Sequence, residues 1–201
     1  MKGSIIILLF FSIGLIAGIF GSNSGFENID NISLYALYML MFFVGIGVGA
    51  DKRVWDTLKK INLKIVTVPV IVIAGTISGT FICSLFLKDI TTLDAMAIGS
   101  GFGYYSLSSI LISKIRDETL GIIALIANIT REIFTLIATP ILVKYFGKIA
   151  PIASAGATSM DTTLPVITKY SGKEYAIISV FSGVVLTILV PPIITLIYKF
   201  M

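Results

Sequence analysis

The chain has 201 residues, of which 56% are hydrophobic and 13% charged, with a formal net charge of +4. So apolar a composition excludes an ordinary soluble domain, and repeated apolar runs of membrane-spanning length predict an all-α integral membrane protein. The basic excess collects in short loops and implies no nucleic-acid partner. Histidine is absent and cysteine occurs once, so the commonest metal ligand and any internal disulfide are excluded.

Seven apolar stretches are long enough to cross a bilayer, within one membrane domain covering 1–201. They are residues 4–20, 31–50, 63–87, 93–115, 117–145, 149–170 and 175–198. Residues 51–61 carry four basic side chains and one apolar face, which predicts an amphipathic helix on the cytoplasmic surface.

With that loop inside, alternation places the N-terminus in the cytoplasm and the C-terminus outside. Ten basic residues then lie inside and four outside. If the sixth segment alone entered and left on one side, the count would be nine against five. The charges therefore favour a sixth segment that crosses.

The fourth segment is interrupted over residues 99–109. Gly101 and Gly103 weaken the helix there, each costing up to about 1 kcal/mol relative to alanine. Tyr105 and Ser106 follow with hydroxyl groups, which favours a polar cavity wall. The alternative is close helix packing through small residues.

The fifth segment carries a polar stripe near its middle, which begins with Asn128, Arg131 and Glu132. Charged groups at membrane depth must face protein or water. The three formal charges of Arg131, Glu132 and the later Asp161 sum to one negative charge. A proton, a metal cation such as Na⁺ bound at Asp161 and Glu132, or a cationic substrate could balance it. A purely structural ion network is the alternative.

The sixth segment is broken over residues 156–165, Gly-Ala-Thr-Ser-Met-Asp-Thr-Thr-Leu-Pro. Gly156 can end one half-helix, Ser159 or Asp161 can cap the next, and Pro165 fits its first turn. Half-helix ends at mid-membrane are typical of transporter binding sites. We expect Asp161 to be the anionic partner of Arg131, although a kinked helix with a structural Asp161 is also possible.

The run Gly101-Phe-Gly-Tyr-Tyr-Ser-Leu-Ser-Ser109, the stretch from Asn128 to Glu132 and the block 156–165 together resemble the prokaryotic lysine exporter family of the LysO type. The three motifs occur in the family's order and at similar spacing. The resemblance covers the chain from about residue 5 to its end. It implies a transporter, not an enzyme, that exports L-lysine and some of its toxic analogues across the cytoplasmic membrane.

The resemblance also implies an architecture and a site. Longer family members carry about three further N-terminal spans, so we expect a small membrane subunit or a second copy of this chain to complete an inverted-repeat transporter with crossing broken helices. The family's important intramembrane carboxylates would fall on Glu132 and Asp161.

The resulting hypothesis is lysine export driven by exchange for protons or sodium, with no cofactor. Asp161 and Glu132 would bind the substrate ammonium groups or the coupling cation, and Arg131 would hold Asp161 or the substrate carboxylate. The hydrogen-bonding groups would come from Asn128, Tyr105, Ser106, Thr158, Ser159 and Thr162. Three alternatives stay open: a sodium or proton antiporter, a non-catalytic subunit of a larger transporter, and, disfavoured by the lack of histidine, an intramembrane hydrolase.

Overall fold

The computed structural model describes residues 63–200 and six single helical positions before them, Ile13, Tyr35, Met39, Phe42, Ile46 and Ala50. The chain divides into two compact units, Met1–Phe42 and Phe43–Met201, and the features below belong to the second. The predicted spans 4–20 and 31–50 and the amphipathic helix 51–61 lie outside the continuously described residues.

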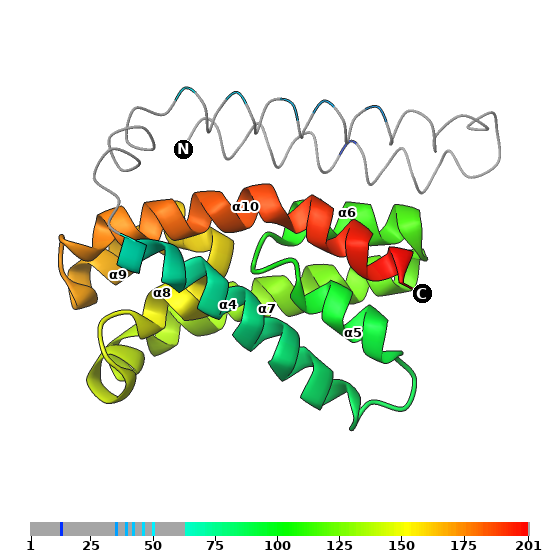
Figure 1. Cartoon of the computed structure of the whole chain (residues 1–201), viewed down its shortest axis with the longest axis horizontal. Coiled ribbons are helices and arrows are strands. Elements are labelled where there is room, and N and C mark those ends of the chain that lie inside the picture. The colour runs from blue at the N-terminus through cyan, green and yellow to red at the C-terminus, as the bar shows by residue number, and fades with distance from the viewer. Residues whose placement is uncertain are drawn as a thin grey trace. The chain divides into compact units, whose positions relative to one another are not determined.

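Three long helices run through the second unit: α4 (Leu63–Ser84), α7 (Glu118–Phe146) and α10 (Tyr175–Lys199) (Figure 1). In the described part of the chain these three are long and apolar enough to cross a membrane. They correspond to the predicted segments 63–87, 117–145 and 175–198. The rest of the described chain forms shorter helices and no strand.

The first broken segment is a hairpin formed by α5 (Thr92–Gly99) and α6 (Tyr105–Ile115). With a rise of 1.5 Å per residue, its 8- and 11-residue helices are about 12 and 16 Å long, roughly half of a 30 Å hydrocarbon core. Arg116 Nε, just after α6, lies 3.4 Å from Asp94 Oδ1 in the first turn of α5. The two arms therefore begin and end at the same end of the unit.

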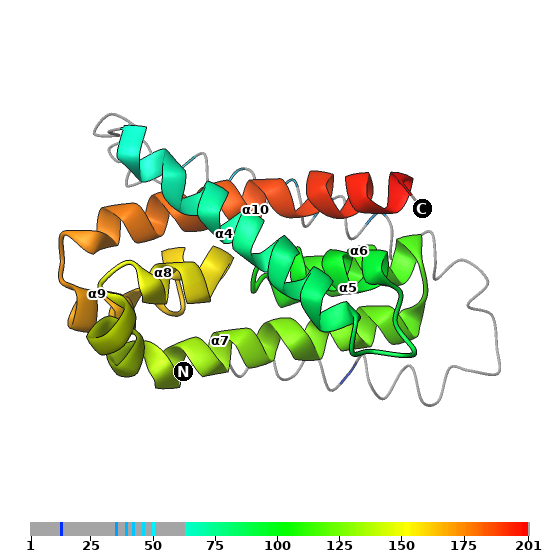
Figure 2. The same ribbon diagram turned by 60° about the horizontal axis from the view of Figure 1, so that its bottom comes forward.

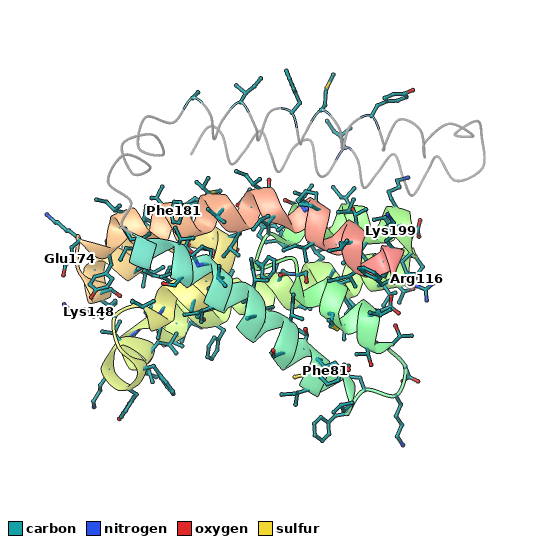
Figure 3. The ribbon with its side chains drawn as sticks, viewed as in Figure 1. Phe81, Arg116, Lys148, Glu174, Phe181 and Lys199 are labelled. Atoms are coloured by element: carbon teal, nitrogen blue, oxygen red, sulfur yellow. The ribbon has the colours of Figure 1, made fainter. Side chains whose placement is uncertain are left out.

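The second broken segment is also a hairpin, made of α8 (Ala150–Ala155), the 3₁₀ helix η1 (Gly156–Met160) and α9 (Leu164–Ser171). Lys148 Nζ, just before α8, lies 3.6 Å from Glu174 Oε1, just after α9. This base lies at the opposite end of the unit from Arg116 and Lys199 (Figure 3). We call the two ends the Lys148 end and the Arg116 end.

This arrangement corrects the prediction that residues 93–115 and 149–170 each cross the membrane. Both segments are broken near their middle, and each half is too short to span alone. The glycine-rich breaks reverse the chain, so each hairpin returns to the end it came from. The two hairpins enter from opposite ends, between the long helices (Figure 2).

Helix α10 packs against both hairpins and against α4, and its central part is buried. At the Lys148 end, Val68 of α4 packs with Ile152 of α8 and Ile167 of α9. Gly183 of α10 allows η1 to approach closely, because a Cβ at that position would lie 2.8 Å from Ala157 O. This packing fixes the second hairpin against α10.

Candidate functional site

The tips of the two hairpins meet in the middle of the unit. We call residues 100–104 the first tip and residues 156–163 the second tip. The backbone N–H of Ala157 donates to Phe102 O at 2.8 Å, which joins the two tips directly. Because the arms of the first hairpin are about half as long as a 30 Å hydrocarbon core, the tips meet part-way along the long helices.

Backbone conformation at the tips requires glycine or strain. Gly103 has φ +92 and Gly156 has φ +66, both in the left-handed region, and Phe102 adopts φ +47 although it has a side chain. A Cβ on Gly156 would collide with Phe102 O, and one on Gly103 would lie 2.8 Å from Ala155 O. The two glycines therefore permit both the turns and the close approach of the tips.

Asn128 of α7 holds the first tip. Its Oδ1 accepts from Gly103 N at 2.7 Å, and its Nδ2 donates to Ile98 O at 3.0 Å and to Ala124 O at 2.9 Å. A Cβ on Gly101 would lie 2.6 Å from Nδ2, so glycine is needed for this approach. Asn128 is buried, and its amide is committed to the protein backbone rather than to a ligand.

Arg131, one turn further along α7, holds the second hairpin. Its Nε donates to Ser154 O at 2.8 Å and its Nη2 to Ala153 O at 3.1 Å, while Nη1 donates to Thr76 of α4 at 3.3 Å. The two carbonyls belong to the last turn of α8, where the helix dipole is negative. The guanidinium therefore caps a broken helix end.

The predicted ion pair between Arg131 and Asp161 is wrong in this structure. Within the described residues, no ion pair joins Arg131 to Asp161, whereas Arg116 pairs with Asp94 and Lys148 with Glu174. A break in a helix leaves backbone carbonyl groups without hydrogen-bond donors. Here such carbonyl groups, and not the carboxylate of Asp161, accept the hydrogen bonds of Arg131.

Hydroxyl groups stabilise the second tip from within. Ser159 Oγ lies 2.7 Å from Gly156 O and 2.9 Å from Ser179 O of α10. Thr158 Oγ1 donates to Ala155 O at 3.0 Å, and Thr163 Oγ1 donates to Thr158 O at 2.9 Å. These buried hydroxyls, which include the predicted Thr158 and Ser159, hold the non-helical backbone in place.

Asp161 is the open carboxylate of the second tip. It is exposed, and among the described residues its Oδ1 accepts hydrogen bonds only from its neighbour Thr162, at 2.6 Å from N and 3.4 Å from Oγ1. The phenol of Tyr104, in the first tip, lies within electrostatic range of this carboxylate. Asp161 thus retains acceptor capacity beside the junction of the tips.

Glu132 of α7 is half-buried and, within the described residues, makes no hydrogen bond or ion pair. It lies one helical turn from Asn128. Ser106 and Tyr105 occupy the first turn of α6 and are half-buried.

The second half-helices begin without side-chain caps. The N-cap positions of α6 and α9 are Tyr104 and Thr163, and neither makes a capping hydrogen bond. The prediction that Ser159 or Asp161 caps α9 is therefore wrong, because the N-cap position, Thr163, lies two residues after Asp161. Pro165 does lie in its first turn, and Gly156 does end α8. The positive ends of both half-helices therefore lie near the tips without a side-chain cap.

Sequence reasoning missed several residues that build this region. The sequence prediction named Tyr105, but Tyr104 also interacts electrostatically with Asp161. Thr76 of α4 accepts a hydrogen bond from Arg131. Asp94, buried at the base of the first hairpin, was also missed. A lone threonine in an apolar helix and an acid in a helix first turn are common, so neither is a signal by itself. In the described part of the chain, no group of three or more acidic or cysteine side chains could hold a metal ion.

Comparison with known proteins decides the family. The model of the family described as lysine exporter LysO matches residues 8–198. The chain belongs to the LysO family. It is 32% identical over 188 residues to the protein named Lysine exporter LysO of Escherichia coli K12, which covers 92% of this chain and 60% of that protein.

A second LysO relative comes from Haemophilus influenzae Rd and bears the name "Putative lysine exporter". It is 32% identical over 170 residues, covering 83% of this chain and 84% of that protein. This chain thus spans about 60% of the length of the E. coli relative. No solved structure is significantly similar to the chain. The match to an exporter family confirms the resemblance drawn from the three motifs.

Proposed function

We propose that this chain is a multi-pass transporter that exports L-lysine across the cytoplasmic membrane. Support comes from its family and from one observation above all: two broken helices from opposite ends meet next to Asp161, a carboxylate that, within the described residues, accepts hydrogen bonds only from its neighbour Thr162. Half-helix ends opposed at mid-membrane are how secondary transporters build binding sites.

A cationic substrate fits the charges of this region. Arg131 is engaged by the carbonyls of Ala153 and Ser154, so the charges of Asp161 and Glu132 are not neutralised by it. An exposed carboxylate at membrane depth is costly unless water or a cation faces it. We propose that Asp161 binds an ammonium group of lysine, and that Glu132 binds the second ammonium group or the coupling cation after a conformational change.

The substrate carboxylate needs a positive counterpart. The negative ends of α5 and α8 receive donors from Asn128 and Arg131, whereas the N-termini of α6 and α9 have no side-chain cap. Backbone N–H groups at a helix N-terminus favour an anion. We propose that the first turn of α6, which contains Tyr105 and Ser106, receives the lysine carboxylate.

The orientation follows from the basic residues. Positions 52–64, just before and within the first turn of α4, hold five of them, and four more lie at the Lys148 end, Lys144, Lys148, Lys169 and Lys173. The Arg116 end holds four, Lys88, Lys114, Arg116 and Lys199. We propose that the Lys148 end faces the cytoplasm, with the C-terminus outside.

Two parts of the proposal go beyond this chain's described residues. Lysine export is driven by exchange for protons or sodium, and the inverted arrangement of hairpins is completed by a membrane subunit or a second copy. Exchange of labelled lysine by the purified chain alone in proteoliposomes separates the subunit from the second copy, because a chain that needs a different subunit would show none, whereas a chain completed by a second copy would exchange lysine.

The decisive variant for transport is Asp161→Asn, which keeps the size and removes the charge. Lysine efflux from cells should be abolished while the amount of protein in the membrane is unchanged. Thr168→Val is the matched control, since Thr168 bonds only within α9. Normal efflux in Asp161→Asn would refute the assignment.

Labelling of single cysteines tests the topology, in a chain whose native Cys83 is replaced by alanine. Cysteines at Lys88 and Lys114 should react with an impermeant reagent from the same side, and one at Lys169 from the other. If Lys88 and Lys114 were labelled from opposite sides, the first hairpin would cross and the fold would be wrong.

A further inference from the structure

At the Lys148 end, three lysine side chains lie over tyrosine rings. The pairs are Lys144–Tyr145, Lys148–Tyr175 and Lys169–Tyr170, with Nζ-to-centroid distances of 5.1, 5.6 and 5.4 Å. They come from the last turn of α7, the loop before α8, the end of α9 and the start of α10.

The pairs form one surface rather than three separate contacts. Lys148 reaches both Glu174 and Tyr175, which joins the loop 147–149 to the loop 172–174. Lys144 and Lys169 lie in the last turns of the two helices that enter these loops. We call this the lysine–tyrosine surface.

Charge also distinguishes the two ends. The lysine–tyrosine surface, with the neighbouring Lys173, has four lysines and one glutamate, Glu174, a formal charge of +3. The Arg116 end has four basic residues, named above, and four acidic ones, Asp89, Asp94, Asp117 and Glu118, a formal charge of zero. Only the Lys148 end therefore attracts anions over distances of several ångströms.

The aromatic side chains set the depth of this surface. Tyr145 is 68% exposed, Phe146 75% and Tyr170 43%. Tyr145 and Phe146 lie where the long apolar helix α7 ends, and Tyr170 lies in the last turn of α9. Tyrosines in that position sit at the boundary between hydrocarbon and headgroups. The adjacent lysines are then level with the lipid phosphates, and their stems can reach outward from the ring faces.

We infer that the lysine–tyrosine surface binds the phosphate groups of anionic phospholipids. The bound headgroup bridges the end of α7, at Lys144, and the base of the second hairpin, at Lys169. This inference rests on the described side chains and does not depend on lysine being the cargo. A soluble phosphate would not use the exposed aromatic belt, whereas a lipid uses both the belt and the charges.

Native mass spectrometry of the full-length purified chain, titrated with phosphatidylglycerol or phosphatidylcholine, tests the inference. The wild type should bind the first phosphatidylglycerol more tightly than phosphatidylcholine. K144Q/K169Q, which leaves the Lys148–Glu174 ion pair intact, should raise the apparent dissociation constant for phosphatidylglycerol by about fivefold per charge removed. K144R/K169R should retain the wild-type value.

The matched control is K88Q/K199Q, which removes two exposed charges at the Arg116 end. It should change the apparent dissociation constant for phosphatidylglycerol less than twofold. Both glutamine variants should unfold at the same thermal midpoint as the wild type. Equal effects of the two double variants would overturn the inference. Displacement of bound phosphatidylglycerol by soluble glycerol phosphate at millimolar concentration would overturn it too, because the surface would then recognise a free anion.

Discussion

Replacing Asn128 by alanine should destabilise the junction of the tips without touching the carboxylates. The Gly103 N–H would lose its partner in a buried site, which costs about 1–3 kcal/mol. Ile98 O would lose one of two donors, since Gly101 N still reaches it at 3.3 Å, for about 0.5–1.5 kcal/mol more. The bond to Ala124 O lies within α7 and adds little. The total is about 2–4 kcal/mol.

The assay is unfolding of the purified protein in mixed micelles, followed by circular dichroism. A loss of 2–4 kcal/mol corresponds to a fall of roughly 5–15 °C in the thermal midpoint for a chain of this size. Thr130→Ala, at an exposed position on the same helix, should shift it by less than about 2 °C. An equal shift in the two variants would refute the bracing role of Asn128.

Two further variants probe the same junction. Gly156→Ala places a side chain at φ +66 and against Phe102 O, so it should lower the free energy of unfolding by more than about 2 kcal/mol and abolish efflux. The control is Gly79→Ala, which has open space around it and should be neutral or slightly stabilising in the same unfolding assay. A double-mutant cycle of Arg131→Gln and Asp161→Asn, measured by unfolding, should give a coupling energy below about 0.5 kcal/mol, and a coupling above about 1.5 kcal/mol would show that the two side chains pair after all.

The broken helices could be predicted from the sequence because their cause is local. Glycines at alternate positions, and a carboxylate within an apolar run, cannot belong to an undisturbed membrane helix. The polar stripe on α7 could also be predicted from the sequence, because Asn128, Arg131 and Glu132 must face protein or water. These features predicted breaks within residues 99–109 and 156–165, and the structure confirms both breaks.

The reversal of the two segments could not be predicted from the charges. If one segment is a hairpin, every later loop changes side. If both are hairpins, the later loops return to their original sides. With α4 leaving the cytoplasm, the two-hairpin arrangement again has ten basic residues inside and four outside, the same count as seven crossing spans. The positive-inside rule therefore gives equal support to both topologies, and the C-terminus lies outside in each.

The partner of Arg131 could not be predicted for a different reason. A sequence displays the charge of Asp161 but not the unpaired carbonyls that a break creates, and those carbonyls depend on where α8 ends. Once α8 ends at Ala155, the carbonyls of Ala153 and Ser154 lack helical donors and face α7. From charge alone, the Asp161 carboxylate is the preferred acceptor for Arg131. The position of α8 beside α7 makes the backbone carbonyls the acceptors instead.

Equilibrium binding of lysine to the purified chain, by isothermal titration calorimetry, tests the central claim most directly. The account predicts that lysine binds, that norleucine, which lacks the side-chain ammonium group, does not bind measurably, and that Asp161→Asn weakens lysine binding at least about tenfold, as expected for a lost charge-assisted hydrogen bond of 1.5–3 kcal/mol. Binding of lysine to Asp161→Asn with an unchanged dissociation constant would contradict it.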